Sequence, residues 1–202
     1  VAGDSSATAS PGPSSTNAGS QGTFNEFEGG GGNDTITGNG NTRVNYQLAS
    51  AAVTVDIAAG TGHGTAPGDI ANVGIDTFTG VSQIRGSAFD DTLLGGNGSD
   101  SIDGNGGNDV ALMGNGNDTF VWDPGDGSDV LEGQNGTDTM LFNGAGGPEQ
   151  VDLSANGTRL RFFRAQGDIT MDTAGVERVD FNALGGADLV TVNDLSGTDV
   201  GN

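Results

Sequence analysis

The sequence predicts an all-β protein built from short strands that recur along the chain. Helix signals are missing, since no stretch of eleven or more residues has a period of about 3.6, and 39 glycines interrupt the 202 residues. Short β-type runs recur instead, each bounded by Gly, Asn or Asp. Aspartates also recur every nine residues in the middle of the chain, and a fixed spacing indicates a repeat architecture.

Composition excludes several classes of function. The formal net charge is -21, with 27 acidic residues against 6 arginines, so nucleic acids and anionic membranes are disfavoured as partners. With no Cys and one His, His63, the chain offers neither a disulfide scaffold nor a Cys- or His-ligated zinc site. No apolar run is long enough for a transmembrane segment. Abundant carboxylates are ligands suited to Ca²⁺.

We divide the chain into four parts. Residues 1–23 are rich in Ser, Gly and Pro, and form a tail or an assembly segment, because such a terminus becomes ordered only when something holds it. Residues 24–85 form an N-terminal solenoid part, 86–141 the repeat array, and 142–202 a C-terminal solenoid part built from strands. The expected strands include 53–57, 92–94, 119–121, 160–163 and 169–171.

The array is defined by the spacing of its aspartates, which are Asp91, Asp100, Asp109, Asp118, Asp129 and Asp138. Two residues after each lies an apolar residue that we expect to point into the core: Leu93, Ile102, Ala111, Phe120, Leu131 and Met140. Two residues before each, except the first, lies a glycine. An isolated copy occupies 29–37 and contains Asp34. The first repeat of the array, 86–94, is the poorest, with Phe89 at the glycine position.

This G-G-x-G-x-D-x-U-x pattern resembles the RTX, or hemolysin-type, calcium-binding repeat of secreted bacterial proteins. Seven copies carry the resemblance, over 29–37 and 86–141. It implies a right-handed parallel β-roll, or β-solenoid, in which two repeats form one coil and several Ca²⁺ ions lie between stacked turns. It also implies a secreted, extracellular or cell-surface protein. Segments 44–91 and 144–199 are similar to stretches common in large RTX proteins.

The resemblance implies metal ligands from the repeated Asp and Gly positions. These are Asp34, Asp91, Asp100, Asp109, Asp118, Asp129 and Asp138, with Gly30, Gly32, Gly96, Gly98, Gly107, Gly114, Gly116, Gly125, Gly127 and Gly136. Glycines at the first, second and fourth turn positions would allow positive φ and let carbonyls approach an ion. Stacking would place Asp91, Asp109 and Asp129 on one side and Asp100, Asp118 and Asp138 on the other. Each side would then enclose two gaps.

Two irregularities leave details of that arrangement open. The unusual turn at 87–89 affects the first site, and the insertion of Trp122 and Asp123 affects the register of Asp129. We expect the flanks to continue as strands without ions, with 185–188 as a degenerate end turn. Because the array has one large apolar residue per strand at most, we expect Ca²⁺ binding and folding to be one event.

No catalytic motif is present: the chain lacks H-E-x-x-H, G-x-S-x-G and any Cys or Lys nucleophile, so we expect no enzymatic activity. The favoured function is a secreted, calcium-dependent structural protein. It would form a homo-oligomer or polymer through its N-terminal tail or its solenoid ends, giving a filament, surface layer or adhesive stalk. The alternative is a secretion and folding module of a larger secreted enzyme or toxin. Ice binding is less favoured, because the residues before each Asp form no regular ladder of Thr and Asn.

Overall fold

The computed structural model describes residues 24–201, which contain strands and turns but no helix. The predictions made for residues 1–23 lie outside the described residues. A seven-stranded sheet has the order β1 (Asn25–Phe27), β3 (Thr42–Asn45), β7 (Gln83–Arg85), β9 (Ser101–Asp103), β12 (Thr119–Trp122), β15 (Thr139–Asn143) and β19 (Arg178–Asn182). Within 24–201 there is therefore no helix that could cross a membrane.

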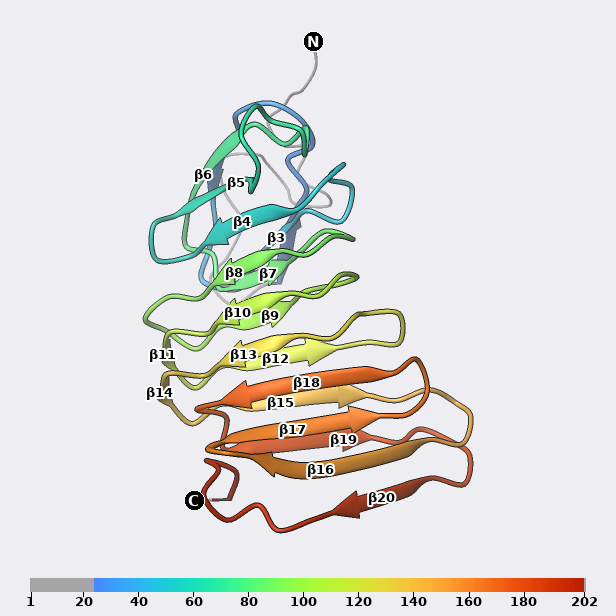
Figure 1. Cartoon of the computed structure of the whole chain (residues 1–202). Helices are drawn as coiled ribbons and strands as arrows, with labels where there is room; N and C mark the ends of the chain where they lie inside the picture. Colours follow the sequence, from blue (N-terminus) through green and yellow to red (C-terminus); the bar gives the residue numbers. More distant parts are fainter. Residues whose placement is uncertain (1–23, 202) are drawn as a thin grey trace.

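An eleven-stranded sheet faces it (Figure 1). Its order is β2 (Thr35–Thr37), β6 (Ile75–Thr79), β5 (Thr61–Gly64), β4 (Val53–Asp56), β8 (Thr92–Leu94), β10 (Val110–Leu112), β13 (Val130–Glu132), β18 (Ile169–Ala174), β17 (Arg159–Arg164), β16 (Gln150–Asn156) and β20 (Leu189–Val192). Two turns pair as a small third sheet, β11 (Asn115–Gly116) with β14 (Asn135–Gly136).

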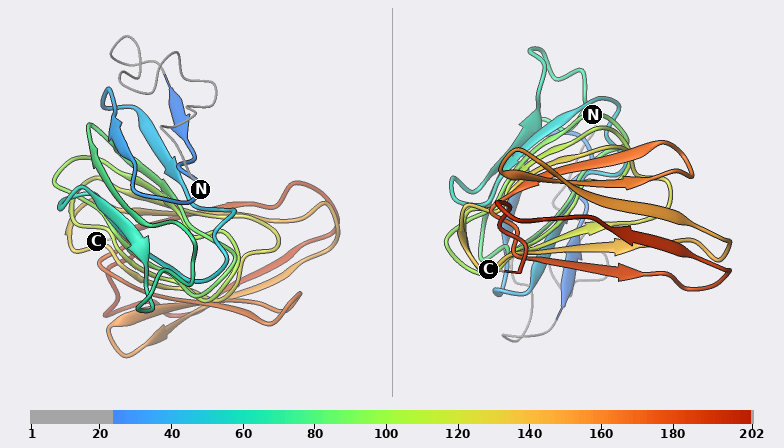
Figure 2. Two further views of the ribbon diagram at one scale, coloured as in Figure 1. Left: turned by 90° about the horizontal axis from the view of Figure 1, so that it is seen from above. Right: turned by 60° about the horizontal axis from the view of Figure 1, so that its bottom comes forward.

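From β7 to β15 the chain alternates between the two large sheets, so two repeats make one coil and the coils stack in parallel (Figures 1 and 2). Leu93, Ala111 and Leu131 are in register on one sheet. Ile102, Phe120 and Met140 are in register on the other. All six are fully buried between the sheets, which confirms the predicted core positions and the β-roll.

Two antiparallel excursions interrupt the parallel stacking. Strands β4, β5 and β6 pair antiparallel near the N-terminal end, and β16, β17 and β18 do so near the C-terminal end. The second excursion inserts two strands, β18 and β17, between β13 and β16 of the same sheet. In Figure 1 these longer orange strands extend beyond the short green and yellow strands of the array. The period-nine pattern could not reveal them, because they carry no repeat.

A cluster of aromatic rings fills the core where the array meets the C-terminal part. Trp122 stacks on Phe142, with ring centroids 3.9 Å apart and an interplanar angle of 6°. Phe142 in turn contacts Phe162, at 4.4 Å between centroids. All three side chains are at most 1% exposed, so large apolar rings fill the core at this place.

The roll is open at its C-terminal end. Val190 and Val192 of β20 lie opposite Val151 and Leu153 of β16, which point into the core. Nothing in the described chain stacks on the other side of β20, so Val190 is 46% exposed and Val192 61% exposed. Core positions are thus uncovered where a further coil would lie.

Candidate metal centre

The structure places the repeated aspartates in two lateral rows, as the sequence predicts. Along the first row, the Asp91 amide donates to Asp109 Oδ1 and the Asp109 amide to Asp129 Oδ1, each at 2.8 Å. Along the second, the amides of Asp100 and Asp118 donate to Oδ1 of Asp118 and Asp138, also at 2.8 Å. The insertion at Trp122 and Asp123 therefore leaves Asp129 in register. Each of these four accepting carboxylates therefore reaches the backbone amide of the turn in the preceding coil.

The second carboxylate oxygen of four of these residues is buried without a partner. Among residues 24–201, Oδ2 of Asp109, Asp118, Asp129 and Asp138 accepts no hydrogen bond. Burial raises the pKa of Asp109 to about 9, of Asp129 to about 7 and of Asp138 to about 6, and it also raises the pKa of Asp118. Neighbouring carboxylates contribute to these raised pKa values. A cation against Oδ2 would satisfy this oxygen and restore the charged form.

Glycines fold each turn over its own carboxylate. A Cβ on Gly133 would lie 2.7 Å from Asp138 Oδ2, and a Cβ on Gly104 would collide with Asp109 Oδ2. Close approach, rather than positive φ, therefore explains the first glycine of the turn. Positive φ occurs at Gly30, Gly32, Gly107, Gly114, Gly116, Gly125 and Gly136, but not at Gly96, Gly98 or Gly127. A side chain on Gly127 would collide with the Gly107 carbonyl of the stacked turn.

In the first turn of each row, protein donors bind the carboxylate oxygens that lack a partner in the later turns. Asp91 Oδ1 accepts hydrogen bonds from the Ser87 hydroxyl at 2.7 Å and from the Val53 amide at 2.8 Å, while Oδ2 accepts the Ser87 amide. Asp100 Oδ2 accepts the Gly96 amide at 2.6 Å. Donors from their own turns, and for Asp91 also the Val53 amide of β4, hold these two residues, so the array carboxylate oxygens without partners belong to the later turns.

Three acidic residues outside the period-nine pattern extend the same lateral bonding. The Asp34 amide donates to Asp76 Oδ1 at 3.0 Å, and the Asp138 amide to Glu177 Oε2 at 2.7 Å. The Glu149 amide donates to Asp188 Oδ1 at 3.0 Å. Because these partners are 42, 39 and 39 residues apart in sequence, the fixed spacing could not reveal them.

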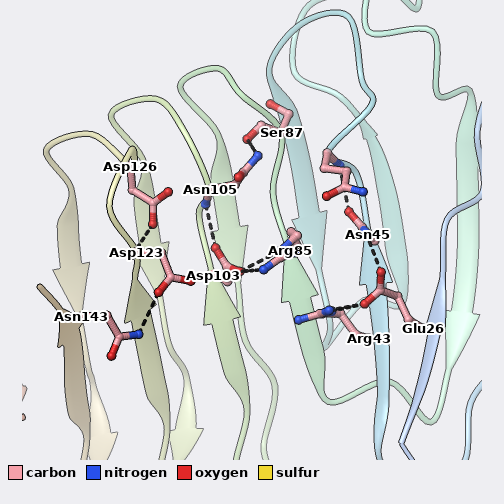
Figure 3. A network of polar contacts seen from close by, with 11 residues as sticks. Glu26, Arg43, Asn45, Arg85, Ser87, Asp103, Asn105, Asp123, Asp126 and Asn143 are labelled. Carbon is pink, nitrogen blue, oxygen red and sulfur yellow. Dashed lines mark hydrogen bonds and ion pairs between the residues drawn. The ribbon is translucent and has the colours of Figure 1, made fainter. Parts of the chain in front are cut away.

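Arginine ion pairs lie on the seven-stranded sheet on the N-terminal side of the array (Figure 3). Arg43 pairs with Glu26, and Arg85 Nη2 lies 2.7 Å from Asp103 Oδ2. Further along, Asp123 and Asp126 have no arginine partner within 24–201. Asp123 Oδ1 accepts Asn143 Nδ2 at 2.8 Å, and burial with nearby Asp103 and Asp123 raises the pKa of Asp126 to about 7. The array is thus an acidic stretch without internal cations.

The donor set fits calcium. Within residues 24–201, no three His, Cys, Asp or Glu side chains come close enough to hold a metal by themselves. A cation between stacked turns would therefore take carboxylate oxygen from the rows and the remaining oxygens from turn carbonyls. Ca²⁺ accepts six to eight such oxygens in flexible geometry, whereas Mg²⁺ requires a tight octahedron.

Comparison with known families agrees with this geometry. The RTX calcium-binding nonapeptide repeat matches in four copies, over residues 22–42, 85–120 and 125–144. Repeats of this family bind calcium and form β-rolls, and the proteins that carry them are typically secreted by bacteria. No curated protein matches the chain. The chain therefore carries RTX calcium-binding repeats over these residues.

Proposed function

We propose that Ca²⁺ folds the array by occupying four sites, one at each unpartnered Asp Oδ2. The observation that carries this proposal is that the number of gaps between stacked turns equals the number of unpartnered Oδ2 atoms in the array. Three stacked turns on each side enclose two gaps, and the later aspartate of each gap is one of Asp109, Asp118, Asp129 and Asp138. Each of these carboxylates reaches back across its gap with Oδ1 and leaves Oδ2 for an ion.

The charge balance supports the same function. No Arg, Lys or His lies between Arg85 and Arg159, and the described arginines pair with Asp103 and Glu132 but with none of the row aspartates, so ions from solution are left to neutralise those buried carboxylates. Burying unneutralised carboxylates is costly, and the short strands bury too few apolar side chains to offset that cost. Binding free energy of the ions would then be folding free energy.

The test is calorimetric titration of calcium-free protein, followed by circular dichroism. We expect about four ions and a gain of β signal. Asp109→Asn and Asp118→Asn should each lose one ion or weaken binding by at least about tenfold. Asp168→Asn is the control, because Asp168 is exposed in a loop at φ 57, which Asn tolerates. Equal behaviour of all three variants would contradict the proposal.

We propose further that the folded roll is a secreted structural element, without catalytic activity, which assembles end to end. The partner is a second copy of this chain, whose residues 1–23 add a strand at the open β20 end. An extended segment rich in Ser and Ala can pair with a sheet edge through backbone hydrogen bonds alone, and β20 offers such an edge with Val190 and Val192 uncovered. In the alternative function, a secretion and folding module, a following segment of a larger protein covers this end.

Sedimentation velocity separates the two functions. With calcium, we expect the intact chain to form species larger than a monomer, and deletion of residues 1–23 to leave a folded monomer. Val190→Asp combined with Val192→Asp should also give a monomer. An intact chain that stays monomeric at high concentration with calcium would favour the module. A deleted form that assembles as well as the intact chain would exclude the tail as the connector.

A further inference from the structure

One turn outside the array has the geometry of a calcium turn. Residues 144–149, Gly-Ala-Gly-Gly-Pro-Glu, cross from β15 to β16, as 104–109 and 124–129 cross between the same two sheets. Glu149 occupies the aspartate position and is 1% exposed. Its Oε2 lies under Gly144, where a Cβ would collide with it, as Asp109 Oδ2 lies under Gly104. Oε2 accepts no hydrogen bond within 24–201.

An arginine lies where the array would need an ion. Arg164 Nε donates to Glu149 Oε1 at 2.6 Å, and Nη1 donates to the Gln166 carbonyl at 2.5 Å. Arg164 is 8% exposed, and its guanidinium carbon lies 5.5 Å from the ring centroid of Trp122. A buried positive charge is thus held by one carboxylate and one carbonyl. These are the two ligand types that the turns of the array offer to calcium.

The inserted strands bring this arginine to the turn. Because β18 and β17 lie between β13 and β16, the loop 165–168 stands between turn 124–129 and turn 144–149. Gln166 fixes the loop: its Oε1 accepts the Gln150 amide and its Nε2 donates to the Pro148 carbonyl, both at 3.0 Å. The RTX repeat match ends at residue 144, the first residue of this turn.

We infer that the guanidinium of Arg164 replaces a metal ion at the Glu149 turn, so that this turn closes without calcium, and that removing the guanidinium converts the turn into an additional calcium site. The inference rests on the proposed function, since it takes the array turns as calcium sites. Without Arg164, both oxygens of a buried Glu149 carboxylate would lack a cation, which is the condition of the four array aspartates.

The test compares Arg164→Gln with Arg161→Gln. Arg161 lies on the same strand, but it is partly exposed, and its Nη1 is as far as 3.8 Å from Asp152 Oδ1. Removal of Arg161 therefore leaves the turn intact. Hydrogen exchange measured by mass spectrometry follows peptides covering 144–153. In chelator, we expect these peptides to stay protected in the natural chain and in Arg161→Gln, and to exchange at least about tenfold faster in Arg164→Gln. Calcium should restore the protection, and calorimetry should count one more ion.

A double variant, Arg164→Met with Glu149→Met, removes both charges and should bind no additional ion. Calcium should leave exchange at 144–153 unchanged in this variant. The inference is overturned if Arg164→Gln stays protected in chelator. It is also overturned if protection is lost and calcium fails to restore it, which would mean a purely structural ion pair. Failure of the proposed function looks different, because the natural chain would then bind no calcium and 86–141 would not respond to it.

Discussion

The array and the C-terminal part use the same two sheets but close their turns by different means. Strands β8, β9, β10 and β13 of the array have three residues each, and 86–141 contains no basic residue. The C-terminal strands β16, β17 and β18 have six or seven residues, carry Arg159, Arg161 and Arg164, and pack on stacked aromatic rings. The difference indicates that a β-roll can neutralise its buried carboxylates with ions from solution or with its own side chains.

The largest expected effect is therefore a split response to chelation. Without calcium, exchange of backbone amides in 86–141 should accelerate at least about a hundredfold, because buried carboxylates without ions destabilise the folded array. Amides in 150–174 should remain protected by their ion pairs and aromatic core. Hydrogen exchange by mass spectrometry measures both regions in one sample. Simultaneous loss in both would show that the roll unfolds as one unit and would remove the contrast.

The second expected effect is a dependence on pH that reverses with calcium. Burial raises the folded-state pKa of Asp109 to about 9 and of Asp129 to about 7, above the ordinary value of 3.8. Folding without metal therefore favours the protonated acids. The folded array is favoured below about pH 4 and loses stability as pH rises from there through the folded-state pKa values.

In calcium-stripped buffer, acidification from pH 7 to about pH 4.5 should thus increase the β signal of the array in circular dichroism. With calcium present, the same acidification should weaken ion binding, because protons compete for the carboxylates. A calcium-free array that becomes less structured on acidification would contradict the buried-carboxylate explanation.

Much of the array could be predicted from the sequence, because its spacing fixes its geometry. Residues two positions after each Asp had to share a face of a strand, and Leu93 and Ile102 are indeed fully buried. The resemblance to the RTX repeat placed Asp109 and Asp129 on one side, but the insertion at Trp122 and Asp123 left the register of Asp129 open, and the structure shows the contact. Local periodicity is sufficient where each coil repeats the last.

The remaining features depend on contacts between residues distant in sequence. Glu177 joins the row of Asp138 from 39 residues away, and no local pattern marks it. Arg164 lies on an alternating strand that predicts only one exposed and one buried face. Its role follows from the two inserted strands, whose place in the sheet order is a property of the fold and not of any short segment.

A third prediction compares the two cores. Phe162→Ala removes a ring that contacts Phe142 in the C-terminal part and should cost about 3–5 kcal/mol with or without calcium. Ile102→Ala should cost about 2–5 kcal/mol, but only when calcium is present, because the array is already unfolded without it. Urea unfolding followed by circular dichroism, with calcium and in chelator, measures both variants. An effect of Ile102→Ala in chelator would show that the array keeps structure without ions.

The smallest expected effect concerns Ser87, which closes the first array turn with its hydroxyl. Ser87 is fully buried, and its Oγ donates to Asp91 Oδ1 at 2.7 Å. In Ser87→Ala, Asp91 keeps its bonds from the Ser87 and Val53 amides, so we expect a loss of about 1–3 kcal/mol in calcium and no change in the number of ions bound. Ser99→Ala is the control, because Ser99 is exposed and its Oγ accepts only the Asn117 amide at 3.3 Å. Urea unfolding in calcium gives the first quantity and calorimetry the second. If Ser87→Ala bound an additional ion, the hydroxyl would itself be excluding calcium from the first turn. The roll would then contain, besides the Glu149 turn, a second turn that a side chain keeps free of metal.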